Sequence, residues 1–141
     1  MLFREIKTFL TALTYFSRIP APNFEFKQEY LKNSGRYFSS IGILIGSLSF
    51  LAYFATAQLL PQNISIIISI IFSVLLTGAF HEDGLADMAD GIGGGWTKVD
   101  KLKIMKDSRI GTYGSSALIL LFLLKLNLLL ELTHIVDSTH L

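Results

Sequence analysis

The chain has 141 residues, of which 51% are hydrophobic and 16% are charged. The charged fraction lies well below the roughly 25% of soluble globular domains, so the composition argues against a soluble domain. With a formal net charge of +1, no nucleic-acid partner is predicted, and the absence of cysteine fits a protein whose polar parts face the cytoplasm.

Residues 1–36 are predicted to form an amphipathic, cytoplasmic segment. Across Leu2–Phe16, large apolar residues recur at helical spacing and are interrupted by charged residues. This pattern predicts a helix that lies on the membrane surface or against a helix bundle, and not a cleavable signal peptide. The prolines that follow Arg18 end the helix. Arg18 is assigned to substrate binding, with a lipid-facing anchor as an equal alternative.

Residues 37–80 contain no Asp, Glu, Lys or Arg. Such a stretch is about twice the roughly 20 residues that one membrane-spanning helix needs. The turn-forming run Pro61-Gln62-Asn63 divides it. We therefore predict a helical hairpin, with one helix near Tyr37–Leu60 and a second near Ile64–Phe80. A buried pair of soluble helices is the alternative, but soluble helices of this length carry a polar stripe.

The run from His81 to Gly91 holds four carboxylates and one imidazole directly after the hairpin. If a helix continues through the run, Asp83, Asp87 and Asp90 lie at i, i+4 and i+7 and share one face. Like charges at this spacing repel. Mg²⁺ prefers one or two carboxylates together with substrate phosphates, and it would remove the repulsion. The three aspartates are therefore predicted metal ligands, with Glu82 as a weaker candidate. A solvated acidic cluster is the alternative, although the C-terminal end of a spanning helix disfavours anions.

The next run, Gly91–Gly95, is glycine at all but one position. Because glycine backbone can approach a ligand closely, Gly93 and Gly94 are predicted to cradle a phosphate through their N–H groups. A flexible linker is the equal alternative. Thr97 followed by Asp100 then predicts the start of a short helix, in which Asp is a poorer version of the capping-box Glu.

Lys106 and Arg109 precede the last apolar segment and suit phosphate, Lys as a point charge and Arg as a bidentate fork. Asp107 is expected either to complete a metal site or to orient Arg109. Together with Ser108 and Thr112, Asp107 is assigned to substrate binding. Juxtamembrane basic charge that meets anionic lipid is the alternative. An acidic run and cations on one loop, however, are the usual apparatus for displacement at phosphorus.

Residues 115–136 are predicted to form the third membrane span. From Leu118 to Leu132 the segment is rich in Leu, with Ile and Phe, and is interrupted by Lys125 and Glu131. One central Lys costs about 2.5–3.5 kcal/mol on the insertion scale, which a run of apolar residues offsets. Its side chain is expected to snorkel, with a functional contact to a partner helix as the less favoured alternative. The predicted fold is all-α: a polytopic membrane helix bundle with about three transmembrane helices and an N-terminal amphipathic helix.

The basic residues predict the topology. They gather before the hairpin and within residues 81–114, whereas the hairpin turn has none. The positive-inside rule therefore places the N-terminus and the 81–114 loop in the cytoplasm. We expect an integral protein of the lipid bilayer with a cytoplasmic active-site loop at 81–114, where Mg²⁺ and nucleotides are available.

Four stretches carry a resemblance to a known family. The run His81–Gly91, followed by Ile104–Gly114, resembles the cobalamin synthase family, whose members are adenosylcobinamide-GDP ribazoletransferases. Phe16–Pro22 and Tyr37–Gly46 are similar to the opening segments of that family, in the same order. Family members continue through further membrane helices. We therefore expect residues 1–141 to be the N-terminal part of one longer family domain and to lack part of the corrinoid or ribazole pocket.

The resemblance implies a Mg²⁺-dependent transferase of the bacterial cytoplasmic (inner) membrane that acts in cobalamin biosynthesis. Such an enzyme transfers adenosylcobinamide phosphate from adenosylcobinamide-GDP to α-ribazole or its 5′-phosphate and releases GMP. Lys106 and Arg109 are expected to stabilise charge on the departing phosphate. His81 is expected to accept the proton of the ribazole hydroxyl, with a metal ligand or an interfacial residue as equal alternatives. A homo-oligomer is compatible with this assignment.

Three other functions fit parts of the pattern. CDP-alcohol phosphotransferases also set aspartates at a membrane helix end, but the Ala-Arg of their motif is missing after Asp83-Gly84. Membrane prenyltransferases hold Mg²⁺ with aspartates four apart, as in Asp83 and Asp87, but they do not explain Lys106–Gly114. A divalent-cation transporter would place carboxylates near the bilayer midplane, whereas these follow the span.

Overall fold

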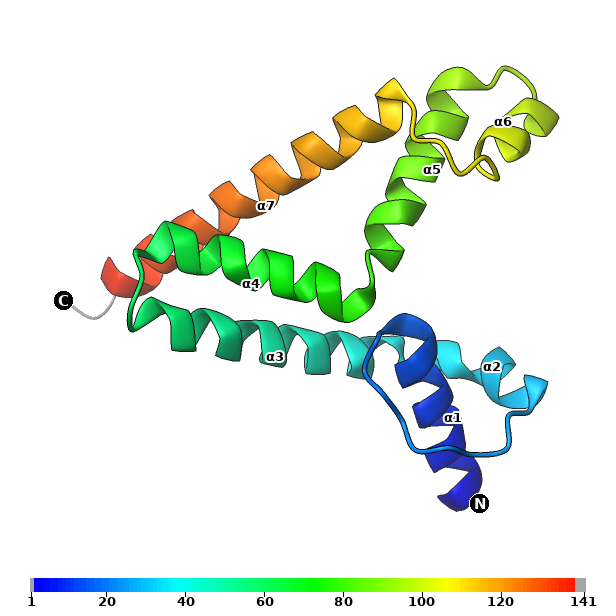
Figure 1. Cartoon of the computed structure of the whole chain (residues 1–141), viewed down its shortest axis with the longest axis horizontal. Helices are drawn as coiled ribbons and strands as arrows, with labels where there is room; N and C mark the ends of the chain where they lie inside the picture. Colours follow the sequence, from blue (N-terminus) through cyan, green and yellow to red (C-terminus); the bar gives the residue numbers. More distant parts are fainter. Residues whose placement is uncertain (1, 139–141) are drawn as a thin grey trace. The chain divides into compact units, whose positions relative to one another are not determined.

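The structure, a computed structural model, describes residues 2–138 and the side chains of residues 2–135. All regular structure in this described part is helical, as predicted, and Figure 1 follows the helices along the chain. The chain divides into two compact units, one that ends at Phe80 and one that begins at His81.

The first unit begins with α1 (Leu2–Phe16), which confirms the predicted N-terminal helix. The C-terminal half of α1 packs against the first turns of α3 (Phe38–Ala57), as Figure 1 shows. The buried residues of this contact are Ala12, Leu13, Ile41 and Ile45. The other end of α1 leaves Leu2 and Phe3 exposed. One part of the amphipathic helix therefore packs on the bundle, while its N-terminal turn keeps apolar side chains on the surface.

A polar contact ties α1 to the segment before α3. This segment consists of α2 (Gln28–Ser34) and the 3₁₀ turn η1 (Gly35–Tyr37). The Tyr37 hydroxyl donates to Glu5 Oε2 at 2.8 Å, and Arg36 forms an ion pair with the same oxygen. The Tyr37 hydrogen bond, together with the Arg36 guanidinium, holds the pKa of the Glu5 carboxyl below its ordinary value. Glu5 is therefore ionised at neutral pH and links α1 to η1, the turn directly before α3.

The predicted hairpin is confirmed. It consists of α3 and α4 (Gln62–Thr77), which run antiparallel on either side of a turn at Pro61 (Figure 1). Small residues let the two helices approach closely. The Ser69 hydroxyl of α4 donates to the Ser49 carbonyl of α3 at 2.8 Å. This interhelical hydrogen bond satisfies a hydroxyl that would be costly to leave unpaired in an apolar bilayer.

Two helical segments of the described residues are long and apolar enough to cross a membrane. They are Gln28–Ala57, which includes α2, η1 and α3, and Thr112–Ile135 in α7. A third candidate arises only if α4 and the following helix α5 count as one broken span. The prediction of about three spans agrees with the upper number. With 16 residues, α4 is shorter than the roughly 20 that a straight span needs. These candidate spans indicate an integral membrane protein.

The break after α4 lies at Gly78 and Ala79, both of which adopt left-handed backbone conformations, with φ of 66° and 60°. Their N–H groups bond to the carbonyls at the end of α4: Gly78 to Leu75 at 3.2 Å and Ala79 to Val74 at 2.9 Å. This pattern is a Schellman cap. Glycine adopts the left-handed conformation freely, whereas alanine is strained there.

Substitutions at these two positions should therefore have opposite effects. Gly78→Ala should lower the free energy of unfolding by about 1 kcal/mol, because a Cβ at Gly78 would also crowd the Arg18 side chain. Ala79→Gly should leave thermal stability unchanged or raise it. Thermal unfolding of the detergent-solubilised protein measures both, and equal losses in the two variants would contradict the assigned strain.

The second unit contains α5 (Phe80–Gly94) from His81 onward, then α6 (Lys98–Ile104) and α7 (Thr112–Ser138). Most of the stretch that the sequence marks as the 81–114 loop is thus helical. The start of α6 confirms the predicted capping box: Asp100 N–H donates to the Thr97 hydroxyl oxygen, and Thr97 N–H donates to the Asp100 carboxylate, both at 3.2 Å.

Candidate functional site

The acidic run forms the first half of the candidate site, on α5. The helix continues through the whole run, so Asp83, Asp87 and Asp90 share one face, as their spacing predicts. The three side chains differ in burial: Asp83 is exposed, Asp87 is half-buried and Asp90 is buried. In the described part of the chain, no protein hydrogen bond reaches the carboxylate of Asp83 or Asp87. Among the described residues, these two carboxylates are therefore not committed to a hydrogen bond.

Asp90 is 8% exposed, and its carboxylate is already occupied. Its Oδ2 accepts a hydrogen bond from Gly111 N at 2.7 Å, and its Oδ1 accepts one from Gly114 N at 2.8 Å. These are backbone N–H groups at the start of α7, which otherwise lack helical partners. Asp90 thus caps α7 from a different helix and joins α5 to the end of the 106–114 loop.

Glu82 carries an unsatisfied oxygen. Its Oε2 is buried and has no hydrogen-bond partner among the described residues. Burying a carboxylate oxygen without a donor or a cation is costly. The atom lies one residue before Asp83, on the helix that carries the other predicted ligands. Carboxylate oxygens are what Mg²⁺ prefers, so the unsatisfied Glu82 oxygen is of the right chemical type for a hard cation, but neighbouring residues of a helix such as Glu82 and Asp83 do not face each other.

Among the described side chains, those of residues 2–135, no group of three or more His, Asp or Glu converges as a ready-made metal cage. The predicted ligand set of Asp83, Asp87, Asp90 and Glu82 therefore stays a prediction.

The glycine run is packed against neighbouring elements. A Cβ on Gly91 would meet the Met105 side chain at 2.5 Å, and one on Gly95 would meet Lys101 N at 2.7 Å. Both neighbours lie in or next to α6. Gly93 and Gly94, the predicted phosphate cradle, lie in the last turn of α5. A Cβ on Gly93 would collide with the Tyr113 ring. Close packing therefore explains glycine at positions 91, 93 and 95, and phosphate binding by Gly93 and Gly94 stays a prediction.

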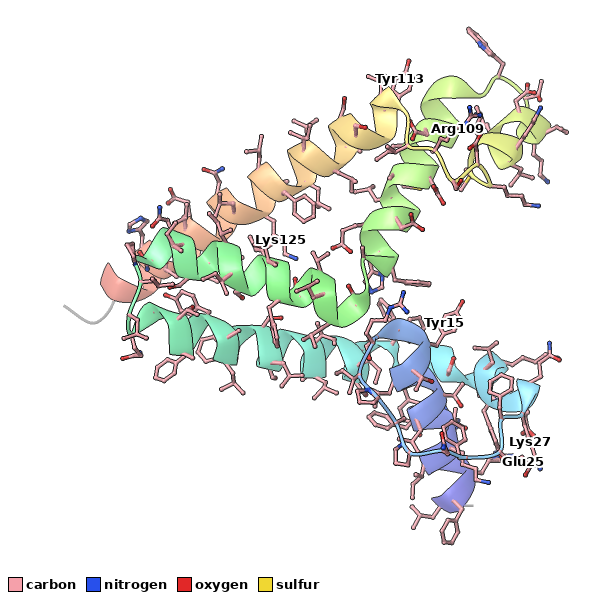
Figure 2. The ribbon with its side chains drawn as sticks, in the orientation of Figure 1. Tyr15, Glu25, Lys27, Arg109, Tyr113 and Lys125 are labelled. Carbon is pink, nitrogen blue, oxygen red and sulfur yellow. The ribbon has the colours of Figure 1, made fainter. Side chains whose placement is uncertain are left out.

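The loop between α6 and α7 carries the basic half of the candidate site, and Figure 2 shows Arg109 on it. Asp107 holds Arg109 in place: Arg109 Nε donates to Asp107 Oδ1 at 3.0 Å, and Nη2 donates to Oδ2 at 2.7 Å. The backbone N–H of Arg109 also donates to Oδ1, at 3.1 Å. Of the two roles predicted for Asp107, the structure provides the orientation of Arg109. The Arg109 side chain is 87% exposed, so its guanidinium is both oriented and accessible.

This pair should be visible in a titration of Asp107. The side-chain and backbone hydrogen bonds from Arg109 lower the pKa of Asp107 from 3.8 to about 2. Because the folded pKa is depressed, the pair stabilises the loop fully above pH 4 and loses that contribution as the pH falls towards 2. Carboxyl-carbon NMR of the labelled protein should give a pKa near 2 for Asp107. An Arg109→Ala variant should return it towards 3.8, and a normal pKa in the parent protein would contradict the pairing.

The remaining predicted residues of the second unit lie on or near these elements. His81 lies in the first turn of α5 and is exposed. Lys106 and Ser108 lie in the α6–α7 loop and are exposed, and Thr112 begins α7. Through Asp90 and the α7 cap, the structure joins the segment that holds Lys106 and Arg109 to the helix that holds the acidic run.

Arg18 belongs to the first unit, where it contacts the last turn of α4. Its backbone N–H donates to the Leu76 carbonyl at 2.6 Å, and its side chain lies against Gly78. A cation at the C-terminal end of a helix interacts favourably with the exposed carbonyls. This contact explains Arg18 structurally, and its assignment to substrate binding stays a prediction.

Three residues of this site had no role in the sequence-based prediction. The N–H groups of Gly111 and Gly114 donate to the Asp90 carboxylate. The Tyr113 ring packs over Gly93. The available signal was a pair of glycines, three apart, directly before an apolar span. Such a pair indicates that another group approaches the backbone closely. That group is Asp90, which lies more than twenty residues away in the chain, so no local pattern identifies it.

Comparison with known proteins gives consistent matches. A family model described as cobalamin-5-phosphate synthase matches residues 8–140. An adenosylcobinamide-GDP ribazoletransferase of Vibrio cholerae serotype O1 is 54% identical over 129 residues, which is 91% of this chain and 49% of the relative. Enzymes of the same description from Shewanella sp. strain W3-18-1 and Shewanella baltica are 53% and 52% identical over 130 residues, which is 92% of this chain and 50% of each relative.

The chain therefore spans about half the length of the curated relatives that it matches. No solved structure matches it.

Proposed function

Since the chain belongs to the cobalamin-5-phosphate synthase family, we propose that it contributes the metal and phosphate half of an adenosylcobinamide-GDP ribazoletransferase site. The reaction would transfer adenosylcobinamide phosphate to α-ribazole or its 5′-phosphate and release GMP. The observation that carries the proposal is the pair of hydrogen bonds from Gly111 and Gly114 to Asp90. Through them, the cationic loop is attached to the acidic helix.

The carboxylates of α5 would hold Mg²⁺, with Asp83 and Asp87 as the first ligands and the buried Oε2 of Glu82 as a further one. Support comes from the uncommitted lone pairs of the two aspartates and from the unsatisfied Glu82 oxygen. When bound, Mg²⁺ supplies positive charge to the diphosphate oxygens.

The chain's own residues would serve the displacement as follows. Arg109, oriented by Asp107, grips the phosphate oxygens through its fork, and Lys106 adds a point charge. The ribazole hydroxyl oxygen forms a bond to the phosphorus of adenosylcobinamide phosphate, and the bond from that phosphorus to the GMP oxygen breaks. His81 takes the hydroxyl proton. Negative charge that develops on the GMP phosphate is stabilised by the two cations.

The site is proposed to face the cytoplasm of a bacterial inner membrane, because the basic residues lie in the N-terminal segment and in residues 81–114. Lipid contact and a homo-oligomer are part of the same proposal. The family match over residues 8–140 favours this function over a prenyltransferase, a CDP-alcohol phosphotransferase or a cation transporter.

The test is GMP release from adenosylcobinamide-GDP and α-ribazole in proteoliposomes. Because the chain spans half of its relatives, it should be assayed both alone and in place of the matching half of the Vibrio cholerae relative. Mg²⁺-dependent GMP release by the joined protein would support the proposal. Cation flux without GMP release would contradict it and favour a transporter.

A further inference from the structure

We propose that Asp90 is a positioning residue that seats the cationic loop on α5, and not a metal ligand. This inference rests on the proposed transferase function. The aspartates of α5 would then have two roles: Asp83 and Asp87 face the ligand, and Asp90 holds the structure that brings Arg109 to it.

The hydrogen bonds of Asp90 carry this assignment. Each carboxylate oxygen accepts one backbone N–H: Oδ2 from Gly111 at 2.7 Å and Oδ1 from Gly114 at 2.8 Å. Both lengths are typical of strong, charge-assisted hydrogen bonds. The carboxylate also lies at the N-terminal end of α7, where the helix dipole favours a negative charge. A cation bound to these oxygens would compete with both effects.

Gly111 and Gly114 leave space for the Asp90 carboxylate because they have no side chain. A Cβ on Gly111 would lie 2.5 Å from Asp90 Oδ1, and a Cβ on Gly114 would lie 3.0 Å from Asp90 Cγ and from the Ala86 carbonyl oxygen. Any side chain at either position would push the α7 end away from α5. The two backbones approach this closely only because both positions are glycine.

The contact between Asp90 and the two glycines lies close in sequence to the groups that would act on phosphate. Arg109 precedes Gly111 by two residues, and two residues of chain reach at most about 7 Å. Asp87 precedes Asp90 by one turn of α5. Fixing Gly111 to Asp90 therefore limits where the Arg109 backbone can lie relative to Asp87. Positioning of this kind matters because a displacement of about 1 Å can cost a hundredfold in rate.

The test compares Asp90→Asn, Gly114→Ala and Asp87→Asn in the joined protein. Asp90→Asn keeps the size of the side chain but sets an amide N–H₂ against a backbone donor. Gly114→Ala leaves every carboxylate in place. Both should lower kcat at saturating Mg²⁺ by at least about tenfold and leave the Mg²⁺ concentration for half-maximal rate unchanged. Asp87→Asn should raise that concentration.

Hydrogen exchange provides a readout that does not depend on activity. The amides of residues 109–114 should exchange faster in Asp90→Asn and Gly114→Ala, but not in Asp87→Asn. The proposal is overturned if Asp90→Asn shifts the Mg²⁺ dependence as Asp87→Asn does, or if exchange at 109–114 stays at the parent rate. If the parent protein releases no GMP, the proposed transferase function is contradicted. The exchange experiment still tests the contact of Asp90 with Gly111 and Gly114 independently.

Discussion

Asp87→Asn is expected to lower Mg²⁺-dependent GMP release by at least about a hundredfold, the largest effect of any single substitution in this site. The substitution keeps the size and most of the polarity of the side chain but removes the charge that would bind the cation. Asp87 is half-buried on the face of α5 that also carries Asp83 and Asp90, and no protein hydrogen bond in the described part of the chain occupies its carboxylate. The loss should therefore be one of metal binding, with little loss of folding. Rate against Mg²⁺ concentration in proteoliposomes measures it.

A matched control is Glu29→Gln, which makes the same kind of change at an exposed ion pair with Arg4 in the first unit. It should leave turnover and Mg²⁺ dependence unchanged, since exposed pairs contribute little. Thermal unfolding of both variants should stay close to that of the parent. A normal Mg²⁺ dependence in Asp87→Asn would remove this residue from the ligand set.

Arg109→Lys should lower turnover by at least about tenfold, although the charge is kept. The reason is geometric. Asp107 binds Nε and Nη2 of the Arg109 fork, and the plane of the guanidinium is fixed by that pairing. Lysine has a single ammonium group that cannot be held in this way or grip a phosphate through two parallel bonds. The measurement is kcat and KM for adenosylcobinamide-GDP at saturating Mg²⁺.

Two further variants separate the orientation of Arg109 from a general effect of replacing an exposed arginine. Asp107→Asn keeps Arg109 but weakens its orientation, so turnover should fall in the same direction and by less. Arg4→Lys changes an exposed arginine on α1 and should have no effect. If Arg109→Lys and Arg109→Ala both keep full turnover, Arg109 only anchors the loop to lipid, and the phosphate clamp is wrong.

The parts of the fold that depend on local pattern were predictable. A charge-free stretch with one turn-forming interruption predicted the α3–α4 hairpin, because a membrane span needs length and hydrophobicity and little else. Thr97 and Asp100 predicted the start of α6, because a capping box needs only its own turn. Helical spacing placed Asp83, Asp87 and Asp90 on one face for the same reason.

The roles of several site residues depended on partners that are distant in sequence. Spacing made Asp90 equivalent to Asp83 and Asp87, but its partners are the N–H groups of Gly111 and Gly114. The glycine run predicted a phosphate cradle, which stays a prediction, and its packing against Met105, Lys101 and Tyr113 was not predicted. Such contacts are set by how helices pack and not by the residues next to each other.

The sequence alone therefore determined the membrane class, the N-terminal helix, the hairpin, the start of α6 and the last span, and the chemical types present: carboxylates on one helix face and a Lys-Asp-Arg loop before a span. It did not predict α2 or η1. Hydrophobicity, helical period and capping act within a few residues, so they can be read in chain order. Only the tertiary structure decided which carboxylate is committed to a cap, which oxygen is left unsatisfied and why the glycines are needed. Those properties arise from groups that meet only after the helices have packed, when two backbone hydrogen bonds distinguish Asp90 from Asp83 and Asp87, which the sequence makes alike.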